Sequence, residues 1–170
     1  MTTRTRFRIY VSIAAMMLTA ALAVPAAAQQ RVPFKGTFQG NDAVTLGPSP
    51  TTIVVTTTGT GIGTLVGRFS FIEEITANLA NGLHTGTALW TAANGDTVST
   101  TVFGTAAPSD NPNYLKITET HTITGGTGRF TGAQGSFSVD RMHAFAAESD
   151  GTHLTFGSFQ GTMTSPGAAR

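Results

Sequence analysis

Residues 115–123 place a carboxyl group and an imidazole on one face of an expected β-strand. The alternate positions of this segment, which share a face in an extended chain, are Leu115, Ile117, Glu119, His121 and Ile123. Glu119 and His121 therefore interrupt a face that is otherwise apolar. Burial raises the pKa of a carboxyl group unless a cation offsets it, and imidazole titrates near neutrality. This pair is suited to proton transfer in a dry cavity.

Two further strand-like runs add titratable side chains to such a face. One face of the run after residue 134 holds Phe137, Val139, Arg141, His143 and Phe145, and an earlier run aligns Glu73 with Phe69, Phe71 and Ile75. In an antiparallel pair, Arg141 and His143 would lie opposite Glu119 and His121. The candidate catalytic residues are therefore Glu119, His121, Glu73, Arg141 and His143. The competing interpretation is a satisfied ion-pair group near a barrel mouth, and a bulge would turn these side chains to solvent.

Sequence signatures of cofactor, metal and nucleophile sites are absent. The chain has no cysteine, no phosphate-binding glycine-lysine loop, no serine nucleophile elbow and no paired-histidine zinc spacing. We therefore expect no cofactor and no metal. His84 and His153 lie near expected strand starts and are interpreted as surface residues. Trp90 shares a face with His84 and small neighbours, and is interpreted as a core residue.

A glycine-punctuated turn is expected within residues 123–137, which read ITGGTGRFTGAQGSF. Gly125, Gly126 and Gly128 allow positive φ angles, which other residues adopt only at a cost. Arg129 and Phe130 are the large side chains that such a turn projects. Arg129 could bind an anion together with turn amides, but the favoured interpretation is a structural arginine at one barrel end.

The rest of the chain is rich in Thr, Gly, Phe and Val, a composition that favours strands. Asn94-Gly-Asp96 predicts a hairpin, since Asn-Gly suits a type I′ turn, and Gly59–Gly63 is expected to form another turn. Short connections and the lack of a helical period predict an all-β, calycin-style barrel of eight antiparallel strands in meander order. The strand-like runs cover residues 34–40, 51–57, 64–77, 82–93, 97–106, 114–124, 134–147 and 152–164.

An eight-stranded outer-membrane barrel is the structural rival, because it shares the alternation of side chains. Such a barrel needs an outer apolar band with aromatic girdles. Here one face of many runs is a threonine ladder, as at Thr118, Thr120 and Thr122. We therefore favour a water-soluble barrel that does not insert into a membrane.

Residues 1–28 have the three parts of a secretion signal. A basic start with Arg4, Arg6 and Arg8 precedes an apolar run, and Pro25-Ala-Ala-Ala28 supplies small residues for cleavage before Gln29. We expect export to the periplasm or the cell exterior, leaving a single barrel domain over 29–170 with a short disordered tail at about 166–170. That domain has seven Lys and Arg against nine Asp and Glu, so its charge gives no support for nucleic-acid binding.

The GGTGRFxGAxGSF pattern in residues 125–137 resembles bacterial secreted proteins with an allene-oxide-cyclase-like or dirigent-like β-barrel. The resemblance implies an eight-stranded barrel and allows a homotrimer. That group includes cyclases that fold a reactive lipid in an apolar cavity and dirigent proteins that orient radical coupling. Plant cyclases of the group use a Glu and a Cys. This chain has no Cys, so the resemblance assigns no catalytic residue.

The sequence leaves three functions open. The first is an exported, non-enzymatic barrel that binds a small hydrophobic ligand or a partner. The second is a cofactor-free cyclase or isomerase that uses the polar cluster on a hydrophobic substrate, and the third is a structural envelope protein. An enzyme needs an open apolar cavity lined by Glu119 or His121, whereas a filled interior favours the other two.

Overall fold

The fold is a closed barrel of eight antiparallel strands in meander order, which confirms the predicted fold class. The computed structural model describes residues 30–164, so the expected signal segment and the C-terminal tail lie outside the described residues. Each strand pairs with its neighbour in sequence, and β1 pairs with β8 to close the barrel. The elements are β1 (Arg31–Leu46), β2 (Thr52–Gly63), β3 (Gly67–Asn78), β4 (Leu83–Ala92), β5 (Thr97–Pro108), β6 (Tyr114–Gly126), the 3-10 helix η1 (Gly128–Phe130), β7 (Gly135–Ala147) and β8 (His153–Thr164).

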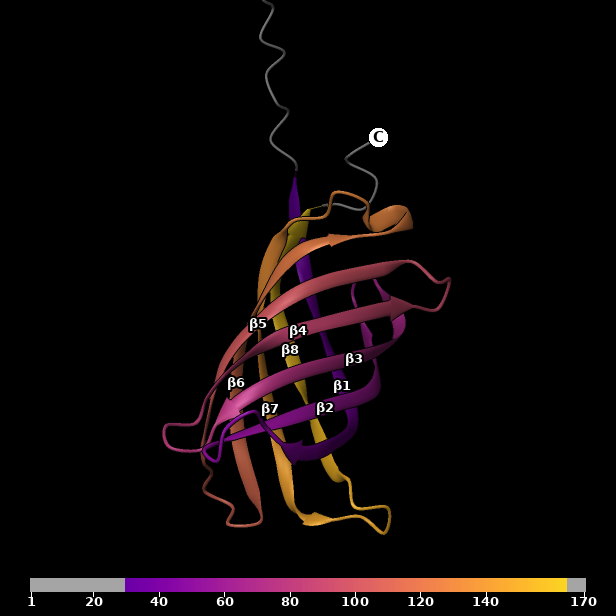
Figure 1. Ribbon diagram of the computed structural model, residues 1–170. Coiled ribbons are helices and arrows are strands. Elements are labelled where there is room, and N and C mark those ends of the chain that lie inside the picture. Colours follow the sequence, from indigo (N-terminus) through magenta and orange to yellow (C-terminus); the bar gives the residue numbers. More distant parts are fainter. Residues whose placement is uncertain (1–29, 165–170) are drawn as a thin grey trace, which may run out of the picture.

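The two ends of the barrel differ in their loops (Figure 1). The start of β1, the end of β8 and η1 lie at one end, where Phe130 and Val66 are buried against the core. The β1–β2, β3–β4, β5–β6 and β7–β8 connections lie at the other end, as the meander order requires. Among the described residues, no helix is long and apolar enough to span a membrane.

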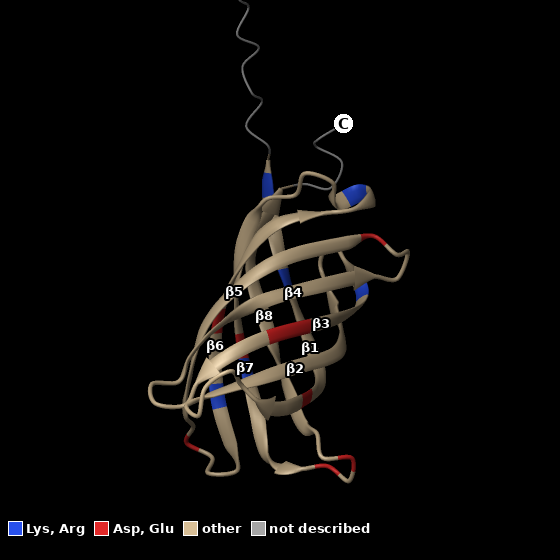
Figure 2. Cartoon of the chain, viewed as in Figure 1, with Lys and Arg blue, Asp and Glu red and all other residues tan. Residues whose placement is uncertain are grey.

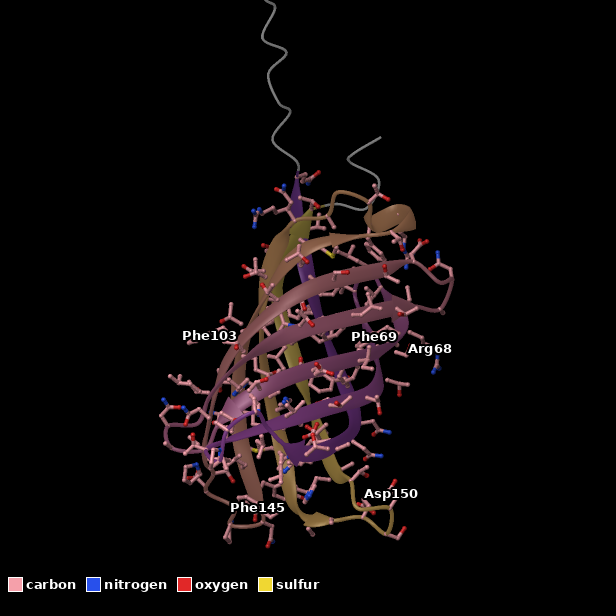
Figure 3. The ribbon with its side chains drawn as sticks, viewed as in Figure 1. Arg68, Phe69, Phe103, Phe145 and Asp150 are labelled. Carbon is pink, nitrogen blue, oxygen red and sulfur yellow. The ribbon has the colours of Figure 1, made fainter. Side chains whose placement is uncertain are left out.

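Side chains alternate between the barrel interior and the outer surface. In Figure 3 the side chain of Phe69 lies inside the barrel, whereas those of Arg68 and Phe103 point outward. Phe69 is buried and Phe103 is 56% exposed. Figure 2 shows that charged residues are few and scattered over the barrel. The outward ladder of Thr118, Thr120 and Thr122 is exposed, as expected.

Interlocked aromatic rings fill the half of the barrel nearer η1. Trp90 is 2% exposed and contacts several other rings, which confirms it as a core residue. Edge-to-face and tilted ring pairs of this kind add to the stabilisation from apolar burial. This half is therefore a packed core without room for a ligand. The rings belong to Phe34, Phe69, Phe71, Trp90, Phe137 and Phe159.

Two turn predictions need correction. Gly59–Gly63 is the last part of β2 and forms no turn. Gly61 lies under the Phe69 ring, where a Cβ would collide with it, so the glycine makes room for an aromatic core. The chain turns instead at residues 64–66, with Leu65 at φ +66°. At 94–96 the predicted hairpin is present but is not type I′, because Gly95 has a positive φ and Asn94 does not.

The glycine-rich connection after β6 is anchored at the η1 end of the barrel. Gly125 and Gly128 have positive φ angles (+156° and +57°), whereas Gly126 does not, contrary to expectation. Gly126 is required for space, since a Cβ there would lie 2.8 Å from the Cβ of Phe130. Arg129 contacts Asp96 with its backbone N–H (3.2 Å) and its Nε (3.6 Å), and its guanidinium lies over the Phe130 ring. These contacts fit the structural interpretation of Arg129.

Candidate functional site

A buried polar cluster crosses the middle of the barrel, between the aromatic core and the open end. The side chains that the sequence nominated from three strands, Glu73 of β3, Glu119 and His121 of β6 and Arg141 of β7, are all buried in it. Asp42 of β1 and His84 of β4 belong to the same cluster. Strand alternation thus brings these groups together, as expected from the residues of β3, β6 and β7.

Arg141 is the centre of this cluster. Its Nε donates to both carboxylate oxygens of Glu119 (3.2 and 3.3 Å), and its NH2 group donates to Glu119 (3.0 Å) and Glu73 (3.4 Å). Its NH1 group donates to Asp42 (3.1 Å) and to the hydroxyl of Thr155 (3.1 Å). All three guanidinium nitrogens are therefore occupied, as a buried arginine requires.

The register of β6 and β7 differs from the expected one. Arg141 pairs with Ile117 and His143 with Leu115, each four positions away from the partner that the antiparallel prediction implies (His121 and Glu119). Glu119 is still reached because the arginine side chain extends diagonally along the pair. The connection that contains η1 sets this offset, since Ile123 pairs with Gly135 on its far side.

Two of the expectations for β7 and β4 are wrong. Phe145 was expected beside Arg141 and His143, but it is 54% exposed, because the β7–β8 register shifts between His143 and Ala147 (Figure 3).

His84 was expected at the surface, but it is 2% exposed and its Nε2 lies 3.1 Å from Glu119. Trp90 on the same face of β4 gave the signal for this burial. His153 is partly buried and contacts the Ala144 carbonyl.

Asp42 is the group that sequence reasoning missed. The expected first strand ended at Gly40, whereas β1 continues to Leu46 and carries the alternation of Phe34, Phe38 and Asp42 inward. The Asp42 carboxylate accepts hydrogen bonds from the Thr57 hydroxyl (2.6 Å) and from Arg141, and it lies 2.5 Å from Nδ1 of His143. Extending the two-residue period of β1 beyond Gly40 would have found it.

Three carboxyl groups around one guanidinium titrate differently. Burial alone would raise the pKa of Asp42, but hydrogen bonding to His143 and the charge of Arg141 lower it. Burial would also raise the pKa of Glu119, but Arg141, His121 and His84 hold it well below its usual value. Burial and the charge of Glu119 raise the pKa of Glu73 to about 8. At neutral pH two carboxylates and one carboxylic acid therefore surround Arg141.

Arg141 itself remains a cation. Burial opposes its charge, but Glu119, Glu73 and Asp42 together outweigh burial and raise its pKa.

The inner side of the cluster faces only a small cavity. This space of about 10 Å³ is bordered by Glu73, Glu119, His121 and Trp90, so it has room for roughly one water molecule. Nε2 of His121 and Nε1 of Trp90 have no hydrogen-bond partner among the described residues. Nδ1 of His121 contacts the Thr100 hydroxyl at 3.0 Å, and its ring stacks on Phe137. Glu119 and His121 are thus brought together, but they line no open cavity.

The same three residues could offer ligands to a metal ion. One atom each from Glu73, Glu119 and His121 lie within 4.8 Å of one another, and carboxylate and imidazole are suitable zinc ligands. Arg141 already donates to both glutamates and would repel a cation there. The arrangement fits a proton shared between buried groups better than a metal.

An open pocket of about 430 Å³ lies on the outer side of the cluster, at the end opposite η1. Its volume falls in the range of small-molecule sites. Most of its walls are aliphatic, and the buried charged groups form its floor. The walls include Val55, Ile75, Leu79, Leu115 and Ile117, and the floor is formed by Asp42, His84, Arg141 and His143.

A larger hollow of about 820 Å³ lies along β1–β4. Thr37, Thr60, Arg68 and Ser70 border it, and it contacts none of the clustered carboxylates or histidines. We therefore take the pocket at the barrel end as the candidate site.

The chain is similar to a protein of known structure at a low level of sequence identity. No protein-family profile matches the sequence, and no curated protein matches it. One solved structure that matches is that of the pterocarpan synthase dirigent protein GePTS1, with 16% sequence identity and a TM-score of 0.47. The match covers 89% of this chain and 99% of that one. The fold described above rests on the strand pairing of this chain, and no functional residue is transferred from this likeness.

Proposed function

We propose that the protein binds a small, mostly apolar molecule in the pocket at the barrel end. The observation that carries this proposal is the 430 Å³ cavity itself, with aliphatic walls over a floor of buried charged groups. Ligand sites typically combine an apolar lining with a few convergent polar groups. A purely structural protein would gain stability from filling this space with side chains, as the opposite half of the barrel does.

The ligand is expected to be neutral. Arg141 has committed all three nitrogens to carboxylates and to Thr155, so it has no donor left for an anionic ligand. Asp42 already accepts from Thr57, Arg141 and His143, so it has little capacity left to accept a hydrogen bond from a cationic ligand. The floor can therefore orient a polar group of the ligand without requiring a charge on it.

A paired substitution on β5 tests this proposal. Ala106 lines the pocket, and its neighbour Thr105 is exposed on the outer surface. Ala106→Trp should fill the pocket and abolish binding of the neutral fluorophore prodan, measured by fluorescence titration, whereas Thr105→Trp should bind like the wild type. Equal binding by all three proteins, or no binding by the wild type, would refute the proposal.

The alternative function is a cofactor-free cyclase or isomerase, and two of the five candidate catalytic residues lie where a substrate in the pocket could contact them. Arg141 and His143 border the pocket, whereas Glu73, Glu119 and His121 lie behind the floor. The observation that favours this alternative is the contact of His143 with Asp42 at the pocket. A carboxylate that holds an imidazole in this way is an arrangement suited to a general base. A structural envelope role requires no pocket, so loss of prodan binding in Ala106→Trp alone would argue against it.

Export and assembly are part of the same proposal. We propose that residues 1–28 direct the chain to the periplasm or the cell exterior, and that the barrel is water-soluble there. The threonine ladder on β6 supports solubility, and a homotrimer is the proposed assembly. Purification without detergent tests the first point and native mass spectrometry the second. Rescue of an aggregated protein by detergent would favour a membrane barrel instead.

A further inference from the structure

We infer that His143 is a general base, and that the pocket moves a proton on a neutral carbon acid without a cofactor. A carbon acid here means an apolar molecule with a C–H bond next to a carbonyl or similar electron-withdrawing group. The inference rests on the proposed binding function and adds an activity to it.

The contact with Asp42 fixes which nitrogen of His143 can accept a proton. Asp42 receives hydrogen bonds from Thr57 and Arg141, and these contacts keep it a carboxylate. A carboxylate only accepts, so Nδ1 of His143 must carry the hydrogen in this contact. The lone pair of the neutral ring then lies on Nε2. No described residue forms a hydrogen bond with Nε2.

The position of His143 gives this lone pair access to the pocket. His143 borders the pocket, and its side chain is 14% exposed, whereas Asp42 behind it is fully buried. The ring stacks on His153 at 5.0 Å between centroids, and Nδ1 of His153 lies 3.0 Å from the Ala144 carbonyl oxygen. The imidazole is therefore held from two sides, an arrangement that pre-orients a base and reduces the cost of reaching the reactive geometry.

Two asparagines at the pocket can stabilise the charge that develops on a substrate oxygen. The amide oxygen of Asn78 accepts from the N–H of Ala80 (2.8 Å), and that of Asn81 accepts from the N–H of Leu83 (3.0 Å). These bonds orient the two carboxamides and leave their NH₂ groups as donors. Asn78 and Asn81 both border the pocket. Asn78 is partly buried, where a donor is more effective than in water, whereas Asn81 is exposed at the pocket rim.

The proposed step is balanced without any co-reactant. Nε2 of His143 takes the proton from carbon, and the C–H electron pair forms a carbon–carbon double bond while the carbonyl π pair moves to oxygen. The asparagine NH₂ groups hydrogen-bond to that oxygen. The imidazolium then returns the proton to the same carbon or to another carbon of the conjugated system. The product is an isomer of the substrate, and nothing is oxidised or reduced.

The test uses 5-nitrobenzisoxazole, a small carbon acid that reports a base directly. Removal of its ring C–H proton sends the electron pair into a nitrile and breaks the N–O bond, giving a coloured phenolate. The wild type should accelerate this reaction, and His143→Gln should lower the rate by about tenfold or more, the size expected for loss of a positioned base. Asp42→Asn should also lower it, whereas Asp140→Asn, which changes an exposed carboxylate on the same strand as His143, should keep the wild-type rate.

Two measurements separate this inference from the binding proposal. Prodan should still bind to His143→Gln, because the aliphatic walls of the pocket are unchanged, and it should inhibit the wild-type reaction at its own Kd. Prodan binding with equal rates for the wild type and His143→Gln would overturn the inference and leave the binding function standing. A wild-type rate that prodan does not inhibit would also overturn it, even if a variant fails to fold. Absence of prodan binding to the wild type would instead refute the binding function.

Discussion

Arg141 on β7 donates a 3.1 Å hydrogen bond to the carboxylate of Asp42 on β1, although 99 positions separate them in the sequence. The contact crosses the interior of the barrel, and β8 lies between the two strands in the sheet. The same guanidinium holds Glu119 and Glu73. One cation thus links β1, β3, β6 and β7 and separates the packed aromatic half from the open pocket. The stability and the proposed chemistry of the barrel depend on this arrangement.

Glu73→Gln should make stability less dependent on pH. Glu73 has a pKa of about 8 in the folded protein against an ordinary 4.5, so folding retains its proton between these two values. Its contribution is therefore complete below about pH 4.5 and is lost as pH rises through about 8. Relative to the wild type, Glu73→Gln should gain stability from pH 5 to pH 9, by roughly a few kcal/mol.

Urea unfolding at pH 5, 7 and 9 measures this difference. Glu74 is the neighbouring exposed residue, so Glu74→Gln is the matched control and should follow the wild type at each pH. If Glu73→Gln also runs parallel to the wild type, Glu73 is not a buried acid at neutral pH.

Glu119→Gln should destabilise the fold by about 1–3 kcal/mol, because it leaves part of the buried positive charge of Arg141 uncompensated. The loss is limited because removal of the Glu119 charge lets Glu73 ionise and take over part of its role. Thermal or urea unfolding at pH 7 measures the effect. A midpoint equal to that of the wild type would contradict the central position of Glu119 in the cluster.

The two-residue period of the strands allowed the fold and much of the cluster to be predicted. Glu73, Glu119 and Arg141 each lie on the same strand face as large apolar residues. Because only one face of each strand is buried, the charged side chains are buried with them. Asp42 was missed because Gly36 and Gly40 weaken the pattern of β1 before the carboxylate. His84 was misplaced because a position near a strand start was taken as exposed, although it alternates with Trp90.

Other features depend on pairing between distant strands and have no local signal. The four-residue offset between β6 and β7 is set by the length of the η1 connection, and it sends His143 to Asp42. The bulge that exposes Phe145 arises between β7 and β8. The pocket volume depends on all the side chains at one end of the barrel, and no single segment encodes it.

Gly128→Val should lower stability by on the order of a few kcal/mol. Gly128 has a φ of +57°, which a β-branched residue adopts only with strain, and a Cβ there would collide with the carboxylate of Asp96. Gly67 has a similar φ of +68° but open space around it. Comparing Gly128→Ala with Gly67→Ala in a thermal melt separates the collision from the backbone strain. If all these variants melt like the wild type, the turn does not lock the barrel end.

The exported protein should begin at Gln29. The order of basic, apolar and small residues in 1–28 motivates this cleavage site. N-terminal sequencing of the protein recovered outside the cytoplasm measures it directly. Recovery of that fraction with Met1 intact would argue against a cleaved signal.

The central claim is that the barrel end holds a small molecule, and native mass spectrometry of the protein purified from its own host tests it most directly. The wild type and Thr105→Trp should retain the same added mass, which mild activation releases as a neutral, mostly apolar compound. Ala106→Trp, whose pocket is filled, should lack that mass. An equal added mass on all three proteins would place the ligand elsewhere, and no added mass on the wild type would contradict the claim.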